Sequence, residues 1–304
     1  MSRLFDAYMV VDWSAAAKPT MGANSIWIGL RARDARLKFQ FTSVNPKTRL
    51  EARTLIKELL EKLIARGDKV LVGFDFAFGY PRGTAAAARL VKDGQPAWRG
   101  MYQHLATKVK ETSDNSNARF AIAAGLNYAI SKGPHPFWGT TKRDQVSTLA
   151  MKKGDFSAPG SLPEHRLSEA WIRAQFTASP KSVWQLLGAG AVGSQSLLGI
   201  PTVFEIRENI EGARIWPFET GFQTLMPSDL ENVSCVLAEV YPSTVSTVPE
   251  PGEILDQAQV RTLSEHLESL DSAGKLADAF GPPDTLSEAE IDEITCEEGW
   301  ILAK

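Results

Sequence analysis

KVLVGFDFAFGYP, residues 69–81, places one carboxylate inside a short apolar run of the 304-residue sequence. Residues 70–72 have the β-branched and aliphatic character of a central strand that is covered on both faces. Asp75 closes this run and is flanked by Phe74 and Phe76. Burying such a charge is costly unless it is paired or coordinates a cation. A single aspartate at this position is explained by a turn cap or a salt bridge. Whether Asp75 instead belongs to a functional site depends on whether other strands also end in acidic residues.

Two further predicted strands also end in acidic residues. Residues 8–13 (YMVVDW) form a first strand that ends at Asp12, and residues 234–240 (SCVLAEV) form a late strand that ends at Glu239. We expect both to be parallel neighbours of the strand before Asp75. The three acids then meet at the carboxyl edge of the sheet, where open α/β sheets bind their ligands.

The helix predicted over residues 253–270 brings a fourth acid to this edge, because Asp256 lies in its first turns. Carboxylates that lie close together repel and raise one another's pKa unless a cation neutralises them. Mg²⁺ or Mn²⁺, which prefer oxygen ligands, are the expected cations. One or two such ions activate a water and stabilise the leaving oxygen of a phosphodiester. We therefore expect Asp12, Asp75 and Glu239 to bind the metal, and Asp256 to assist catalysis with them.

The remaining pattern predicts a mixed sheet. Residues 25–32 and 36–44 form a hairpin, and the second of these strands alternates apolar and polar side chains. An amphipathic helix over residues 48–66 then leads to the Asp75 strand, which gives the order β-β-β-α-β. Short loops make the first three strands antiparallel, while the helix returns the fourth parallel to one of them.

Residues 82–200 differ in character and contain predicted helices joined by Gly- and Pro-rich loops. We expect them to form a large, basic, mostly helical insertion (a cap) between the fourth and fifth strands. The core then consists of residues 1–81 and 201–304, and the insertion belongs to the same domain.

This order of elements resembles the ribonuclease H-like fold, a mixed five-stranded sheet flanked by helices. Four short segments resemble motifs of a family of unknown function whose members are described as predicted nucleases of that fold: VVDWSA (10–15), GFDFAFGYP (73–81), AEVYPS (238–243) and EEGWILA (297–303). The resemblance implies a metal-dependent nuclease in which Asp12, Asp75 and Glu239 occupy the acidic strand positions. Asp256 is the acid nearest to the position of the family's Asp-rich closing helix.

Charge is distributed unevenly along the chain. Residues 82–183 carry 15 Lys and Arg against 7 Asp and Glu, whereas residues 249–304 carry 3 against 14. The basic segment either holds an anionic substrate, nucleic acid or a nucleotide, or faces the acidic tail. The residues that we expect to bind the substrate are Lys18, Arg166, Lys181 and Gln185. Arg166 equally suits an ion pair with Glu169, three positions further on.

A glycine motif needs separate consideration, because Gly188, Gly190 and Gly193 spell G-x-G-x-x-G. A dinucleotide site requires a strand before the motif and a helix after it. The preceding residues are poor strand formers and Pro201 is expected to cut the helix short. A closely packed turn, or one whose amides face an anion, fits the segment better.

Two other functions remain open. One is an ATP-dependent phosphotransferase of the related kinase superfamily, although the loop DWSAAAKP (12–19) lacks phosphate-cradling glycines. The other is a binding protein that keeps the fold without turnover. No apolar run approaches the ~18 residues of a membrane span, and the only cysteines are Cys235 and Cys296. A cytoplasmic protein that does not contact membranes is therefore expected.

Overall fold

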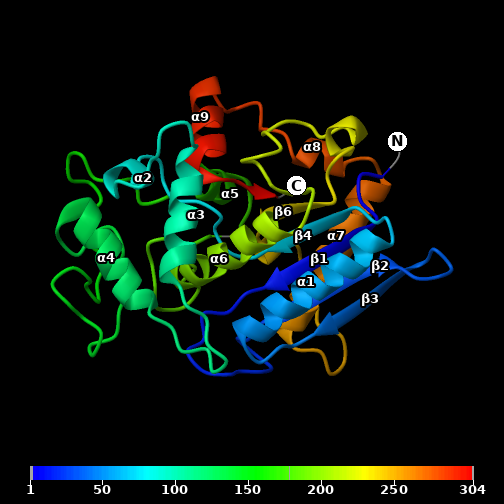
Figure 1. Cartoon of the computed structure of the whole chain (residues 1–304), viewed down its shortest axis with the longest axis horizontal. Coiled ribbons are helices and arrows are strands. Elements are labelled where there is room, and N and C mark those ends of the chain that lie inside the picture. The colour runs from blue at the N-terminus through cyan, green and yellow to red at the C-terminus, as the bar shows by residue number, and fades with distance from the viewer. Residues whose placement is uncertain (1–2, 178, 303–304) are drawn as a thin grey trace.

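The computed structural model describes residues 3–177 and 179–302 and has an α/β fold, with a mixed sheet flanked by helices (Figure 1). The strand order is β3-β2-β1-β4-β6-β5, and β7 also pairs with β6. The strands are β1 (Ala7–Asp12), β2 (Trp27–Arg33), β3 (Phe39–Val44), β4 (Val70–Phe74), β5 (Ala213–Ile215), β6 (Cys235–Val240) and β7 (Ile301–Leu302). No helix in the described part of the chain is long and apolar enough to cross a membrane.

The predicted arrangement of the central strands is confirmed. Strand β1 pairs antiparallel with β2 and parallel with β4, and β4 pairs parallel with β6. The three strands that end in acidic residues are therefore adjacent and run in the same direction. The sheet has seven strands rather than the expected five, because β5 and β7 extend it beside β6. These two are three and two residues long, too short to show an alternating pattern in the sequence.

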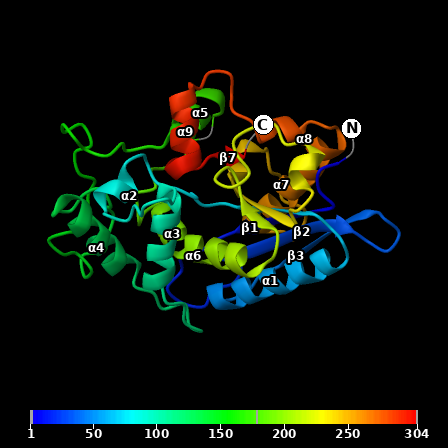
Figure 2. The same cartoon turned by 45° about the horizontal axis from the view of Figure 1, so that its top comes forward.

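Helices cover both faces of the sheet. The longer ones are α1 (Arg49–Ala65), α3 (Ala97–Lys108), α4 (Arg119–Ser131), α5 (Leu167–Gln175), α6 (Gly193–Asn209) and α7 (Leu255–Ser272). The shorter ones are α2 (Thr84–Ala87), α8 (Leu276–Ala279) and α9 (Glu288–Glu293), with short helical turns at Pro227–Leu230, Pro242–Thr244 and Ile294–Glu298. Helices α1 and α7 lie on opposite sides of the strands (Figure 2).

Side chains of the central strands alternate between these two layers, as a strand requires. On β1, Met9 and Val11 belong to the core cluster that includes α1 and α6, whereas Tyr8 and Val10 belong to the cluster that includes α7. Strands β4 and β6 follow the same alternation. This burial on both faces explains the nearly continuous apolar run that precedes Asp75.

The helices of the insertion lie beyond the carboxyl ends of β1 and β4 (Figure 1). The expected boundary at residue 200 lies within α6, whose residues Leu197, Ile200 and Val203 pack in the core below the sheet. The expectation that Pro201 ends this helix is wrong, since α6 continues to Asn209. Proline removes one helical hydrogen bond, but Pro201 and its neighbours are buried, and this packing keeps the helix intact.

Candidate functional site at the carboxyl edge of the sheet

Asp12 and Asp75 lie side by side at the ends of neighbouring parallel strands. Asp12 is the last residue of β1, and Asp75 directly follows β4. The backbone N–H of Asp75 donates to the carbonyl of Val11 (3.2 Å), and the backbone N–H of Trp13 donates to Asp75 Oδ1 (2.7 Å). The second bond is the turn-cap role that a single aspartate predicts. It also fixes the Asp75 carboxylate next to the strand that carries Asp12.

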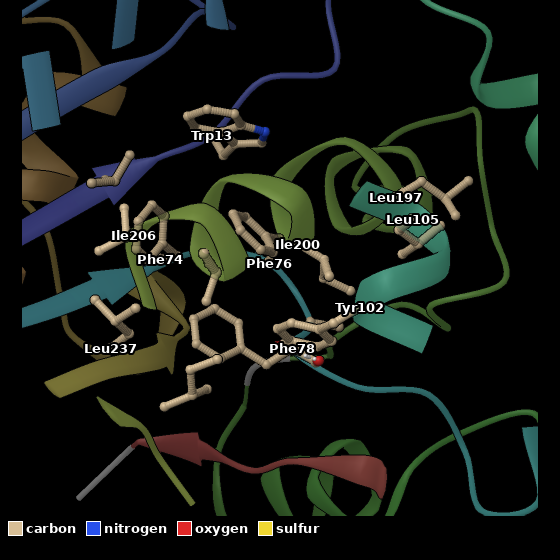
Figure 3. Packing of buried hydrophobic residues seen from close by; sticks show 14 of the residues in the cluster. Trp13, Phe74, Phe76, Phe78, Tyr102, Leu105, Leu197, Ile200, Ile206 and Leu237 are labelled. Atoms are coloured by element: carbon tan, nitrogen blue, oxygen red, sulfur yellow. Dashed lines mark hydrogen bonds between the residues drawn. The ribbon is translucent and has the colours of Figure 1, made fainter. Parts of the chain in front are cut away.

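Aromatic rings hold this segment in place. The ring of Phe76 lies 5.5 Å from that of Phe74 and 5.6 Å from that of Phe78, measured between centroids. Figure 3 shows the three rings and Trp13 packed beside α6. A Cβ on Gly199 of α6 would lie 2.4 Å from the Phe76 ring, so only glycine fits there. The carboxylate of Asp75 is thus anchored on a closely packed, largely apolar base.

Asp256 comes to the same place from the first turn of α7. Its Oδ2 accepts a hydrogen bond from the backbone N–H of Asn24 (2.6 Å). The negative charge of Asp256 raises the pKa of both Asp12 and Asp75, which places Asp256 close to the two strand-end acids.

Burial, together with repulsion from nearby carboxylates, raises the pKa of the two strand-end acids. For Asp12, burial is the larger cause, followed by repulsion from Asp75 and Asp256, and its pKa lies well above the usual range. Burial raises the pKa of Asp75 to about 7, although the hydrogen bonds from Trp13 and Asp12 oppose the rise. Within the described residues, none of the three acids forms an ion pair with Lys or Arg. They form a group of carboxyl groups without a cationic partner among these residues.

Glu239 lies on the same edge in a different environment. Its Oε1 accepts from Arg166 Nη2 (2.6 Å), and its Oε2 accepts from Arg166 Nη1 (2.8 Å) and from the backbone N–H of Phe78 (2.9 Å). Arg166 is also bonded to Glu169, so the ion pair suggested by their spacing is present. The expected ligand set of Asp12, Asp75 and Glu239 is therefore divided, because Glu239 already has a cation bound to both oxygens.

The acids line a cleft of about 640 Å³ between the sheet edge and the insertion. Of the four residues expected to bind substrate, Arg166 and Lys181 line this cleft, and Lys18 and Gln185 do not. Lys18 is exposed on a loop, where its backbone carbonyl accepts a hydrogen bond from the side chain of Asn115. The Gln185 side chain donates to the carbonyl of Leu187 (3.2 Å) instead.

Two other residues of the cleft were not predicted. Arg119 begins α4 and lines the cleft, where burial and the nearby Arg49 lower its pKa. Gln195 lines it too and donates to the carbonyl of Trp13. Neither residue belongs to a motif, and only the folding of the insertion over the sheet edge brings them to the cleft.

The glycine motif lines one wall of the cleft. Gly188 and Gly190 have positive φ angles of 116° and 71°, and a Cβ on Gly193 would lie 2.3 Å from the carbonyl oxygen of Val183. No strand of the described chain lies directly before this segment, since the element that precedes it is α5, so the dinucleotide-binding arrangement is not formed. The motif is a closely packed turn, as expected.

The donor set suits a hydrated divalent ion. Within residues 3–177 and 179–302, no three His, Cys, Asp or Glu side chains are arranged to hold a metal ion by themselves. Mg²⁺, however, usually keeps several waters and uses only one or two carboxylates. Asp12 and Asp75 provide such a pair, with no competing cation and with room in the cleft for waters.

Comparisons of the chain with protein-family models, with curated proteins and with solved structures found no match.

Proposed function

We propose that this protein is a metal-dependent hydrolase of the ribonuclease H-like fold, which cleaves phosphodiester bonds in nucleic acid or a nucleotide. One observation carries the proposal: Asp12, Asp75 and Asp256 converge on one cleft without a cationic partner in the described chain. Structural acids are normally paired, as Glu239 is with Arg166. An unpaired group in a cleft, with raised pKa values, is typical of a functional site.

Each side chain has a distinct role in this proposal. Asp12 and Asp75 hold Mg²⁺ or Mn²⁺, with Asp75 oriented by the N–H of Trp13. Such an ion, when bound, supplies Lewis-acid stabilisation of the reacting phosphate. Asp256 keeps Oδ1 available to accept a proton from water, because the backbone N–H of Asn24 donates to Oδ2. Arg166 binds both oxygens of Glu239, so this carboxylate has a cationic partner and does not face the other acids of the cleft unpaired.

Calorimetric titration with Mn²⁺ tests the proposal. We expect the wild-type protein to bind Mn²⁺, the Asp12→Asn and Asp75→Asn variants to lose this binding, and Asp93→Asn, a change at an exposed residue, to retain it. The same variants are then assayed with Mn²⁺ and bis(p-nitrophenyl) phosphate, whose hydrolysis should follow metal binding. Equal Mn²⁺ binding by wild type and Asp12→Asn would refute the metal site. A parallel assay with ATP distinguishes the phosphotransferase alternative, which requires phosphate transfer without diester hydrolysis.

A further inference from the structure

The size of the cleft limits what it binds. Its volume of about 640 Å³ lies within the range of roughly 300–1,000 Å³ of sites for small molecules. It is bounded by the sheet edge around Asp12 and Asp75, by the start of α7 at Asp256, and by the insertion segment that includes Lys181 and Gln195.

Few cations in the cleft are available to a ligand. Its basic lining residues, in the part of the chain that the structure describes, are Arg119, Arg166 and Lys181. All donors of Arg166 are used by Glu169, Glu239 and the carbonyl of Glu298. Arg119 and Lys181 form no salt bridge with any described residue, and Arg119 Nε has no hydrogen-bond partner there. Two positive groups therefore remain for an anion.

The other described Lys and Arg residues of the insertion do not line the cleft. Several of them are neutralised away from it, in the pairs Arg82–Glu293, Arg99–Glu208 and Lys153–Glu164. The first of these pairs joins the insertion to the acidic tail, as expected if the basic segment faces that tail. A protein that binds duplex DNA tightly typically contacts about 6–10 phosphates, more than two unpaired cations can provide.

On the basis of the proposed function, we infer that the substrate is a small phosphodiester of mononucleotide or dinucleotide size rather than a nucleic acid strand. Arg119 and Lys181 hold its negatively charged end. The scissile phosphate then lies toward Asp12 and Asp75, on the acidic side of the same cleft. The two cations fix the orientation of the substrate, and the carboxylates with their metal carry the chemistry.

Binding and turnover are measured with two probes in Mn²⁺: the 5′-phosphorylated dinucleotide pdTdT, and an oligothymidylate of about 20 nucleotides, longer than common single-strand sites. We expect kcat/KM to be higher for pdTdT. Loss of one charge-assisted contact should raise KM for pdTdT about 10- to 100-fold in Lys181→Ala and in Arg119→Gln, with little change in kcat. Lys152→Ala, a change at an exposed insertion residue that does not line the cleft, is the matched control.

The outcomes separate this inference from the proposed function. Preferred cleavage of the oligothymidylate, or equal KM values for Lys181→Ala and Lys152→Ala, would overturn the inference while leaving a metal-dependent diesterase. Absence of Mn²⁺ binding by the wild-type protein would instead remove the proposed function itself. Lys181 is exposed, so its replacement leaves the fold intact and keeps the test valid if Arg119→Gln is unstable.

Discussion

Both carboxylate oxygens of Glu239 are bonded to the guanidinium of Arg166, at 2.6 Å from Nη2 to Oε1 and 2.8 Å from Nη1 to Oε2. Glu169 contacts the same guanidinium from α5, with 2.7 Å between Nε and Oε1. All three side chains are buried. On the same edge of the sheet, Asp12 and Asp75 have no such partner in the described chain. The edge therefore contains a buried cluster in which two carboxylates share one guanidinium, beside an acidic group with no cationic partner in the described chain.

Replacing Arg166 by methionine should strongly destabilise the protein. The change leaves Glu169 and Glu239 buried without their cation, and breaking a buried pair in this way costs about 3–5 kcal/mol. Urea unfolding monitored by circular dichroism measures the free energy of unfolding. Arg143→Met is the control, because the Arg143 side chain is 91% exposed and its loss should cost less than about 0.5 kcal/mol. Similar losses for the two variants would contradict a structural role for the Arg166 cluster.

In the metal-free protein, the titration of Asp12 should lower the free energy of unfolding as the pH rises. The pKa of Asp12 is raised in the folded state, so the folded protein binds this proton more tightly than the unfolded chain does. The stabilisation from this proton is complete below ~3.9, the pKa of aspartate in the unfolded chain. It is lost as the pH rises through the pKa that Asp12 has in the folded protein. Asp12→Asn removes this dependence, so the variant should become increasingly more stable than wild type between about pH 5 and 8.

Urea unfolding in EDTA over this pH range tests the expectation. The three histidines with lowered pKa values, His104, His135 and His165, act in the opposite direction. They are present in both proteins and cancel in the difference. Asp93→Asn should track wild type at every pH, and a constant gap between wild type and Asp12→Asn would contradict the raised pKa of Asp12.

Mn²⁺ should stabilise the wild-type protein in a pH-dependent manner. Ligand carboxylates must be deprotonated to bind a metal, and burial raises the pKa of Asp75 to about 7. Mn²⁺ affinity should therefore fall at least tenfold for each pH unit below about 7, because the proton of Asp75 competes with the ion and the proton of Asp12, whose pKa is also raised, adds to this competition. At 100 times the dissociation constant, binding adds about 2.7 kcal/mol to the free energy of unfolding. Thermal unfolding with and without Mn²⁺ at several pH values measures both effects, and a shift of equal size in Asp75→Asn would exclude this site.

The sequence predicts the acidic edge well because the signal is local. Asp12 and Asp75 each follow an apolar strand, and parallel strands place their carboxyl ends together. The pairing of Glu239 with Arg166 depends on two residues 73 positions apart, and no pattern at either position indicates it. Arg119 reaches the cleft only through the path of the insertion, which lacks a repeat or a motif. The short strands β5 and β7 show no alternating pattern in the sequence, because pairing with β6 makes them strands.

The contact between Gly199 and Phe76 links packing in α6 to the acidic site. A Cβ on Gly199 would lie 2.4 Å from the Phe76 ring, so Gly199→Ala must displace the ring next to Asp75. Overpacking of this kind costs about 1–3 kcal/mol, and the displaced carboxylate should also bind Mn²⁺ more weakly.

Gly125→Ala in α4 is the matched control, because nothing lies within 4 Å of its Cβ. It should raise stability by up to about 1 kcal/mol through helix propensity and leave Mn²⁺ affinity unchanged. Urea unfolding and calorimetry on both variants separate the two effects. Unchanged Mn²⁺ affinity in a destabilised Gly199→Ala protein would show that the Phe76 ring supports the fold without positioning Asp75.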